Sequence, residues 1–111
     1  MGLPQLLAHW FVTDKVTELA ERIAARSRQA IWQRVWQRVG TLGPAEARGY
    51  IRARAAAIVH QETDRLIAQE GPRASELRDK LIAAATETVI AQLLGQSRHT
   101  RRTNAPIRRV A

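Results

Sequence analysis

The stretch from Ile31 to Val39 reads Ile-Trp-Gln-Arg-Val-Trp-Gln-Arg-Val, in which one apolar residue, Trp, Gln and Arg occur twice in the same order. On a helix, residues four apart lie on one side, so Trp32 and Trp36 form a row. Ile31, Val35 and Val39 form a second row beside it, and the Gln and Arg residues take the remaining arc. We therefore expect an aromatic helix end against which the rest of the chain packs.

Length and composition limit the number of domains, the possible cross-links and the kind of partner. A chain of 111 residues fits one domain, which is long enough to bury a core without a metal or a disulfide. Cysteine is absent, so disulfides are excluded. The net charge of +8 comes from 16 Arg and 2 Lys against 10 acidic residues. This excess favours contact with nucleic acid, anionic lipid or an acidic protein, and the alternative is a basic surface with no partner.

The apolar stretch from Leu3 to Val12 does not indicate a membrane protein. It is too short to span a bilayer, which takes about 20 apolar residues. No basic segment precedes it, as a signal peptide would require. We expect a cytoplasmic protein with no membrane span.

Glycine and proline divide the chain into segments at four places. The segments between them are rich in Ala, Leu, Arg, Glu and Gln, which favour helices. No alternating run of β-branched residues indicates a strand. The sequence thus predicts an all-α fold. The four dividing stretches are Gly2-Leu3-Pro4, Gly40-Thr41-Leu42-Gly43-Pro44, Gly71-Pro72 and Gly95.

The apolar face of the first segment changes direction along the chain. At about 100° per residue, the face before Thr13 points roughly 140° away from the face after it. Thr13-Asp14 can cap a helix, so we predict a short helix over 4–12 and a long one over 14–39. Further helices are predicted over 44–70 and 72–94. Short connections make neighbours antiparallel, which gives an up-down-up three-helix bundle with a short extra N-terminal helix, in one domain over 1–95.

Residues 96–111 form a segment of different composition. They contain five arginines and no acidic residue, with few apolar residues to bury. This composition predicts a flexible, disordered basic tail. The arginines predicted to bind a polyanion are Arg98, Arg101, Arg102, Arg108 and Arg109.

No catalytic motif is present, and Glu62 is the one polar residue at the centre of an apolar stripe. It is a candidate buried polar group: a general acid or base, a metal ligand, an ion-pair partner of Arg26 or Arg34, or a carboxylate that reaches solvent. His60 and Asp64 have the spacing of two metal ligands, but a site needs a third and a fourth. We expect no enzyme, no metal, no cofactor and no small-molecule substrate.

The turn at Gly71 also fits a helix-turn-helix, in which Ser75, Arg78 and Lys80 would face DNA. Glu76 and Asp79, which lie between these residues, would repel the DNA phosphates. Sequence-specific DNA binding therefore stays an alternative.

The function we expect is that of a non-enzymatic interaction protein. It self-associates, most simply as a homodimer, through its apolar helix end, and it contacts a polyanionic or acidic partner through its tail. The alternative is a nucleic-acid-binding protein whose helix and tail arginines contact phosphates. The predicted interface residues are Ile31, Trp32, Val35, Trp36, Tyr50, Ile90, Leu93 and Leu94.

Overall fold

The computed structural model describes the backbone of residues 3–104 and the side chains of residues 14–99. All regular structure in this part of the chain is helical, which confirms the all-α prediction. The helices are α1 (Leu3–Val39), α2 (Pro44–Glu70), α3 (Pro72–Glu76) and α4 (Arg78–Asn104).

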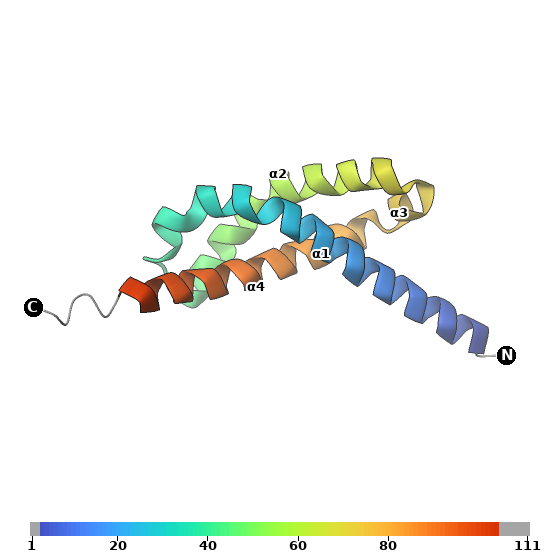
Figure 1. Cartoon of the computed structure of the whole chain (residues 1–111), viewed down its shortest axis with the longest axis horizontal. Helices are drawn as coiled ribbons and strands as arrows, with labels where there is room; N and C mark the ends of the chain where they lie inside the picture. Colours follow the sequence, from blue (N-terminus) through green and yellow to red (C-terminus); the bar gives the residue numbers. More distant parts are fainter. Residues whose placement is uncertain (1–2, 105–111) are drawn as a thin grey trace, which may run out of the picture.

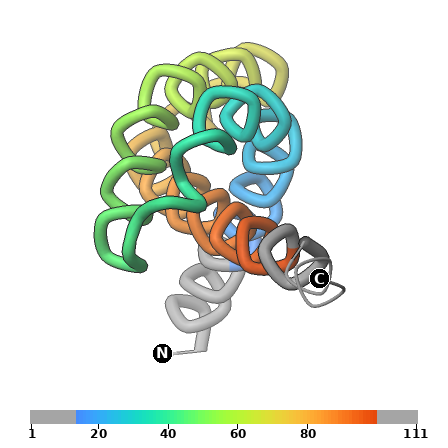
Figure 2. The backbone as a smooth tube through the Cα atoms, turned by 90° about the vertical axis from the view of Figure 1, so that its left-hand side faces the viewer, coloured from blue at the N-terminus to red at the C-terminus, as the bar shows by residue number. Residues whose placement is uncertain are grey.

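The three long helices pack against one another in all three pairs. In Figure 1, α1 and α4 run from right to left. Helix α2, which lies between them in the sequence, runs from left to right. The short helix α3 lies in the turn that joins α2 to α4. Viewed from one end in Figure 2, the long helices enclose a common interior. The molecule is elongated, with extents of 68 × 28 × 20 Å.

Buried side chains recur at every fourth position in each long helix. Each step of four residues advances about 40° around a helix, so the buried row winds around the helix instead of running straight along it. Rows of this kind favour crossing at a large angle, about 50°, and Figure 1 shows α1 passing diagonally over α4. The rows are Leu19, Ile23, Ser27, Ile31, Val35 and Val39; Ala47, Ile51, Ala55, Val59 and Thr63; and Leu81, Ala85, Val89, Leu93 and Ser97.

The predicted break at Thr13-Asp14 is wrong, because α1 is continuous from Leu3 to Val39. A capping residue satisfies donors at a helix end but does not interrupt a helix, and no Gly or Pro lies between Gln5 and Val39. The buried row of α1 itself winds by about 200° between Leu19 and Val39. The side chains of the predicted helix 4–12 lie outside the described residues.

Glycine and proline set the ends of α2 as predicted. Gly43 has an extended backbone, and Pro44 begins the helix. Gly71 ends it with φ of 98°, a conformation that favours glycine. The Gly71 N–H donates to the Ile67 carbonyl oxygen at 2.9 Å. A Gly followed by Pro therefore marks both boundaries.

The predicted helix over 72–94 begins at Pro72 as expected, but it is interrupted and it ends later than predicted. Leu77, with φ of −97° and ψ of 6°, separates α3 from α4. Helix α4 then continues through Gly95 to Asn104, and Ser97 is buried.

The predicted tail therefore begins too early, since residues 96–104 belong to α4. Helix packing continues to Ser97, so this part of the segment has a surface to bury. Arg108 and Arg109 lie outside the described residues.

Gly95→Ala tests the continuation of α4. A methyl group at this position meets no atom within 4 Å, and alanine favours a helix interior over glycine by about 1 kcal/mol. We expect Gly95→Ala to raise the free energy of unfolding by about that amount in urea denaturation. Gly71→Ala is the control and should lower it, because φ is positive there. Destabilisation by both substitutions would mean that Gly95 ends the helix.

Two buried hydroxyl groups differ in their hydrogen bonding. The Thr63 hydroxyl donates to the Val59 carbonyl oxygen at 2.7 Å. The Ser27 hydroxyl is buried with no hydrogen-bond partner among the described residues. A buried polar group without a partner lowers stability.

Ser27→Ala should therefore raise the free energy of unfolding, by about 1 kcal/mol. Thr63→Val is the matched control, and we expect it to leave stability unchanged or to lower it, because its hydroxyl is already bonded. Both values come from urea denaturation. If Ser27→Ala destabilises as much as Thr63→Val, the Ser27 hydroxyl has a partner in solution.

Candidate polyanion-binding site

The second half of α1, the first half of α2 and the second half of α4 meet at one end of the bundle. The turn over 40–43 joins α1 to α2. Ala47 of α2 lines the same small hollow as Leu94 and Ser97 of α4. Arg52 of α2 binds Glu87 of α4 at 2.6 Å. Residues 29–58 and 82–99 are called the basic end below.

The net charge of the described side chains lies at the basic end. It carries six arginines and two glutamates, a net charge of +4. The opposite end, residues 14–28 and 59–81, carries eight basic and eight acidic side chains, a net charge of zero. The chain is thus divided along its length into a positive end and a neutral end. The charged residues of the basic end are Arg34, Arg38, Arg48, Arg52, Arg54, Arg98, Glu46 and Glu87.

Only part of this positive charge is neutralised within the chain. Glu87 binds both Arg48, at 3.3 Å, and Arg52, at 2.6 Å. The other arginines have no acidic partner among the described residues, so they can bind an external anion. These are Arg34, Arg38, Arg54 and Arg98.

Tyr50 brings two of these arginines together in the groove between α1 and α2. The guanidinium carbon of Arg38 lies 5.9 Å from the centre of the tyrosine ring, and that of Arg54 lies 5.1 Å from it. Both distances are typical of cation–π contacts. With Glu46 and Gly49, these side chains line an open groove of about 480 Å³.

The interface assignment is wrong for four of the predicted residues, because their side chains are fully buried inside the chain. The winding row of α1 places Ile31 and Val35 in the same core as Leu19 and Ile23. Tyr50 and Leu94 are half-buried. The four core residues are Ile31, Val35, Ile90 and Leu93.

The tryptophans occupy a different surface from the arginines. Trp36 is 52% exposed and is the one large exposed apolar residue among the described side chains. Trp32 is half-buried against the core. At about 100° per residue, both lie on one side of the buried row of α1, and Arg34 and Arg38 lie on the other.

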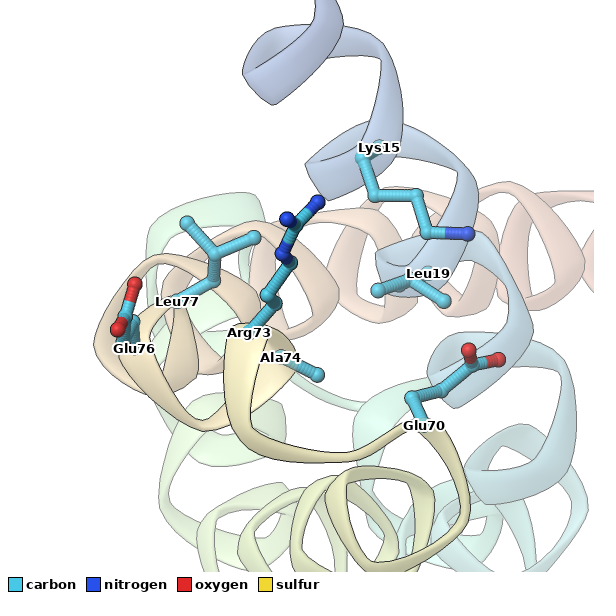
Figure 3. A pocket seen from close by; sticks show the side chains of 7 residues that line it. All are labelled: Lys15, Leu19, Glu70, Arg73, Ala74, Glu76 and Leu77. Carbon is cyan, nitrogen blue, oxygen red and sulfur yellow. The ribbon is translucent and has the colours of Figure 1, made fainter.

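A hollow of about 460 Å³ at the opposite end has balanced charges. Lys15 and Arg73 line it together with Glu70 and Glu76. Figure 3 shows the Glu76 side chain at its edge, turned away from Leu19. No charge of one sign converges there.

The residues around the turn at Gly71 give little support to the helix-turn-helix alternative. Arg78 donates to an oxygen of Asp64 at 2.9 Å. This hydrogen bond lowers the pKa of the Asp64 carboxyl and keeps it ionised. Arg78 is thus already paired, and Ser75 and Lys80 are exposed beside two acidic residues.

Glu62, predicted as a buried polar group, is half-buried, with 16% of its side chain exposed, and it forms an ion pair within α2. The Arg65 guanidinium, three residues further along α2, donates to its Oε1 at 3.0 Å. The predicted partners Arg26 and Arg34 are therefore wrong. Among the side chains of residues 14–99, no group of three or more His, Asp or Glu residues has the arrangement of a metal site.

None of the described helices combines the length and the apolar character that crossing a membrane requires.

The tail arginines are only partly within the described residues. Arg98 is exposed on α4. Arg101 and Arg102 follow it at i+3 and i+4 within the same helix, but their side chains, like all of Arg108 and Arg109, lie outside the described residues.

Arg38 and Arg54 were not predicted as members of a common site. A signal was present, because Glu46 is the only acidic residue between Glu21 and Glu62. This scarcity of acidic residues indicates a common basic site only when it is known which helix ends meet.

Comparison with known proteins reveals no relative from which a function follows. No protein-family model matches the chain, and neither a curated protein nor a solved structure matches it.

Proposed function

We propose that this chain is a non-enzymatic interaction protein that contacts a polyanionic partner through the basic end of its bundle. The observation that carries the proposal is the confinement of net charge to that end, with four arginines that have no acidic partner among the described residues. Concentrated charge of one sign attracts counter-ions, whose release on binding a polyanion favours association. Arg101 and Arg102 extend the same helix, and Arg108 and Arg109 follow them in the sequence.

Replacing Arg98 of the basic end, together with Arg101 and Arg102 that follow it in α4, should weaken binding to a polyanion. In the variant, Arg98, Arg101 and Arg102 become Gln, and fluorescence anisotropy follows a labelled heparin fragment at several salt concentrations. We expect a loss of about tenfold or more. The slope of log K against log salt should also become shallower, because fewer counter-ions are released.

The matched control removes the same charge from the neutral end. In it, Arg28, Arg73 and Lys80 become Gln; none of them has an ion-pair partner among the described residues. We expect binding within about twofold of the wild type, since these three side chains belong to the end that carries no net charge. Equal losses in both variants would show that net charge alone governs binding, and the proposal would fail.

Self-association is a second candidate function, and the exposure of Trp36 favours it. A tryptophan that is 52% exposed beside the half-buried Trp32 presents aromatic surface to solvent. Tryptophan is prominent among the residues that dominate binding energy at interfaces. Because this surface lies on the other side of α1 from Arg34 and Arg38, a dimer formed through it would leave those arginines accessible.

Trp36→Ala should lower the molecular mass in solution to that of a monomer without unfolding the chain. Stability should change by no more than about 0.5 kcal/mol, because the residue lies at the surface. Ile31→Ala is the control and should lower stability by about 2–5 kcal/mol, since it opens a cavity in the core. Sedimentation and urea denaturation give the two readouts. A wild-type chain that stays monomeric at high concentration would contradict self-association.

A further inference from the structure

The groove around Tyr50 combines two guanidinium groups, an aromatic ring and open space beside a glycine. Arg38 and Arg54 both contact the ring, so their guanidinium carbons are at most about 11 Å apart, the sum of the two distances. A guanidinium that contacts a ring through its face still has N–H groups directed outward at its edge. Two cationic groups held near each other without an acidic partner favour an anion between them.

The groove also has room for more than an anion. A methyl group at Gly49, next to Tyr50, would meet no atom within 4 Å. Glycine allows a ligand to approach the backbone closely. Leu42 and the half-buried Tyr50 ring add apolar surface to the lining. The site therefore joins two guanidinium groups, an aromatic ring and an aliphatic side chain in one hollow.

We propose that this groove binds one nucleotide unit of a single-stranded nucleic acid. The phosphate contacts Arg38 and Arg54, and the unpaired base packs against the arginine-covered Tyr50 ring and Leu42. Aromatic rings next to arginines are typical of surfaces that bind single strands, whereas an acidic peptide needs only the arginines. This inference rests on the proposed function and names its partner.

Three single substitutions separate the groove from the rest of the basic end. Gly49→Glu places a negative charge in the groove, and glutamate also favours the helix more than glycine does. Arg54→Gln removes one phosphate donor. Glu46→Gln removes the one carboxylate of the lining and should act in the opposite direction. Gly49→Gln matches the size of glutamate without its charge.

The probe is a labelled single-stranded oligonucleotide of about 12 nucleotides, followed by fluorescence anisotropy at one fixed salt concentration. We expect Gly49→Glu and Arg54→Gln each to weaken binding about tenfold or more, because a charged hydrogen bond is lost or opposed. Glu46→Gln should tighten binding by at least about twofold. Gly49→Gln should lose less affinity than Gly49→Glu. Thermal melting by circular dichroism establishes that each variant is folded.

Competition identifies the class of partner. An unlabelled single strand should displace the probe, and a duplex or polyglutamate of equal charge should displace it at least about fivefold less well. If polyglutamate competes equally and depends equally on Arg54, the partner is an acidic protein and the inference is overturned. Wild-type affinity in both Gly49→Glu and Arg54→Gln overturns it as well. In that case, loss of binding in the Arg98, Arg101 and Arg102 variant would still uphold the proposed function, whereas a wild type that binds no polyanion would refute both.

Discussion

The four-residue spacing of the buried side chains is the constraint on which the rest of the fold depends. An α-helix has 3.6 residues per turn, so a row with a period of four cannot stay on one side of a straight helix. Each long helix must therefore cross its neighbours at an angle to bury its whole row. Alanines in the rows, such as Ala55 and Ala85, leave space at these crossings. A heptad pattern would have favoured helices that run nearly parallel.

Helix ends were predictable where two local signals coincide. Gly43-Pro44 and Gly71-Pro72 combine a flexible residue with one that begins a helix well, and both boundaries of α2 follow from them. Gly95 has no proline after it. Its cost within a helix is about 1 kcal/mol, which the burial of Leu93 and Ser97 on either side offsets. No local signal marks the interruption at Leu77.

The candidate site was less predictable than the fold because it depends on which helix ends meet. Trp36 is exposed, whereas Ile31 and Val35, predicted for the same interface, fill the core. Their assignment assumed a straight apolar stripe. The contact of Tyr50 with Arg54 is an i, i+4 pair within α2, a spacing that the sequence shows. The contact with Arg38 joins α1 to α2, and residues 12 positions apart on different helices have no periodic relation that reveals it.

The described side chains carry a net charge of +4 at one end of the bundle and no net charge at the other, and this uneven distribution gives that part of the molecule an electric dipole. In the field of a polyanion, such a molecule experiences a torque that turns the positive end forward before contact. Orientation of this kind raises association rates at low ionic strength. Once bound end-on, the chain would hold its neutral end tens of ångströms away from the polyanion, well outside the screening length of about 8 Å. A rigid helical bundle would then act as a spacer between the polyanion and whatever contacts the far end.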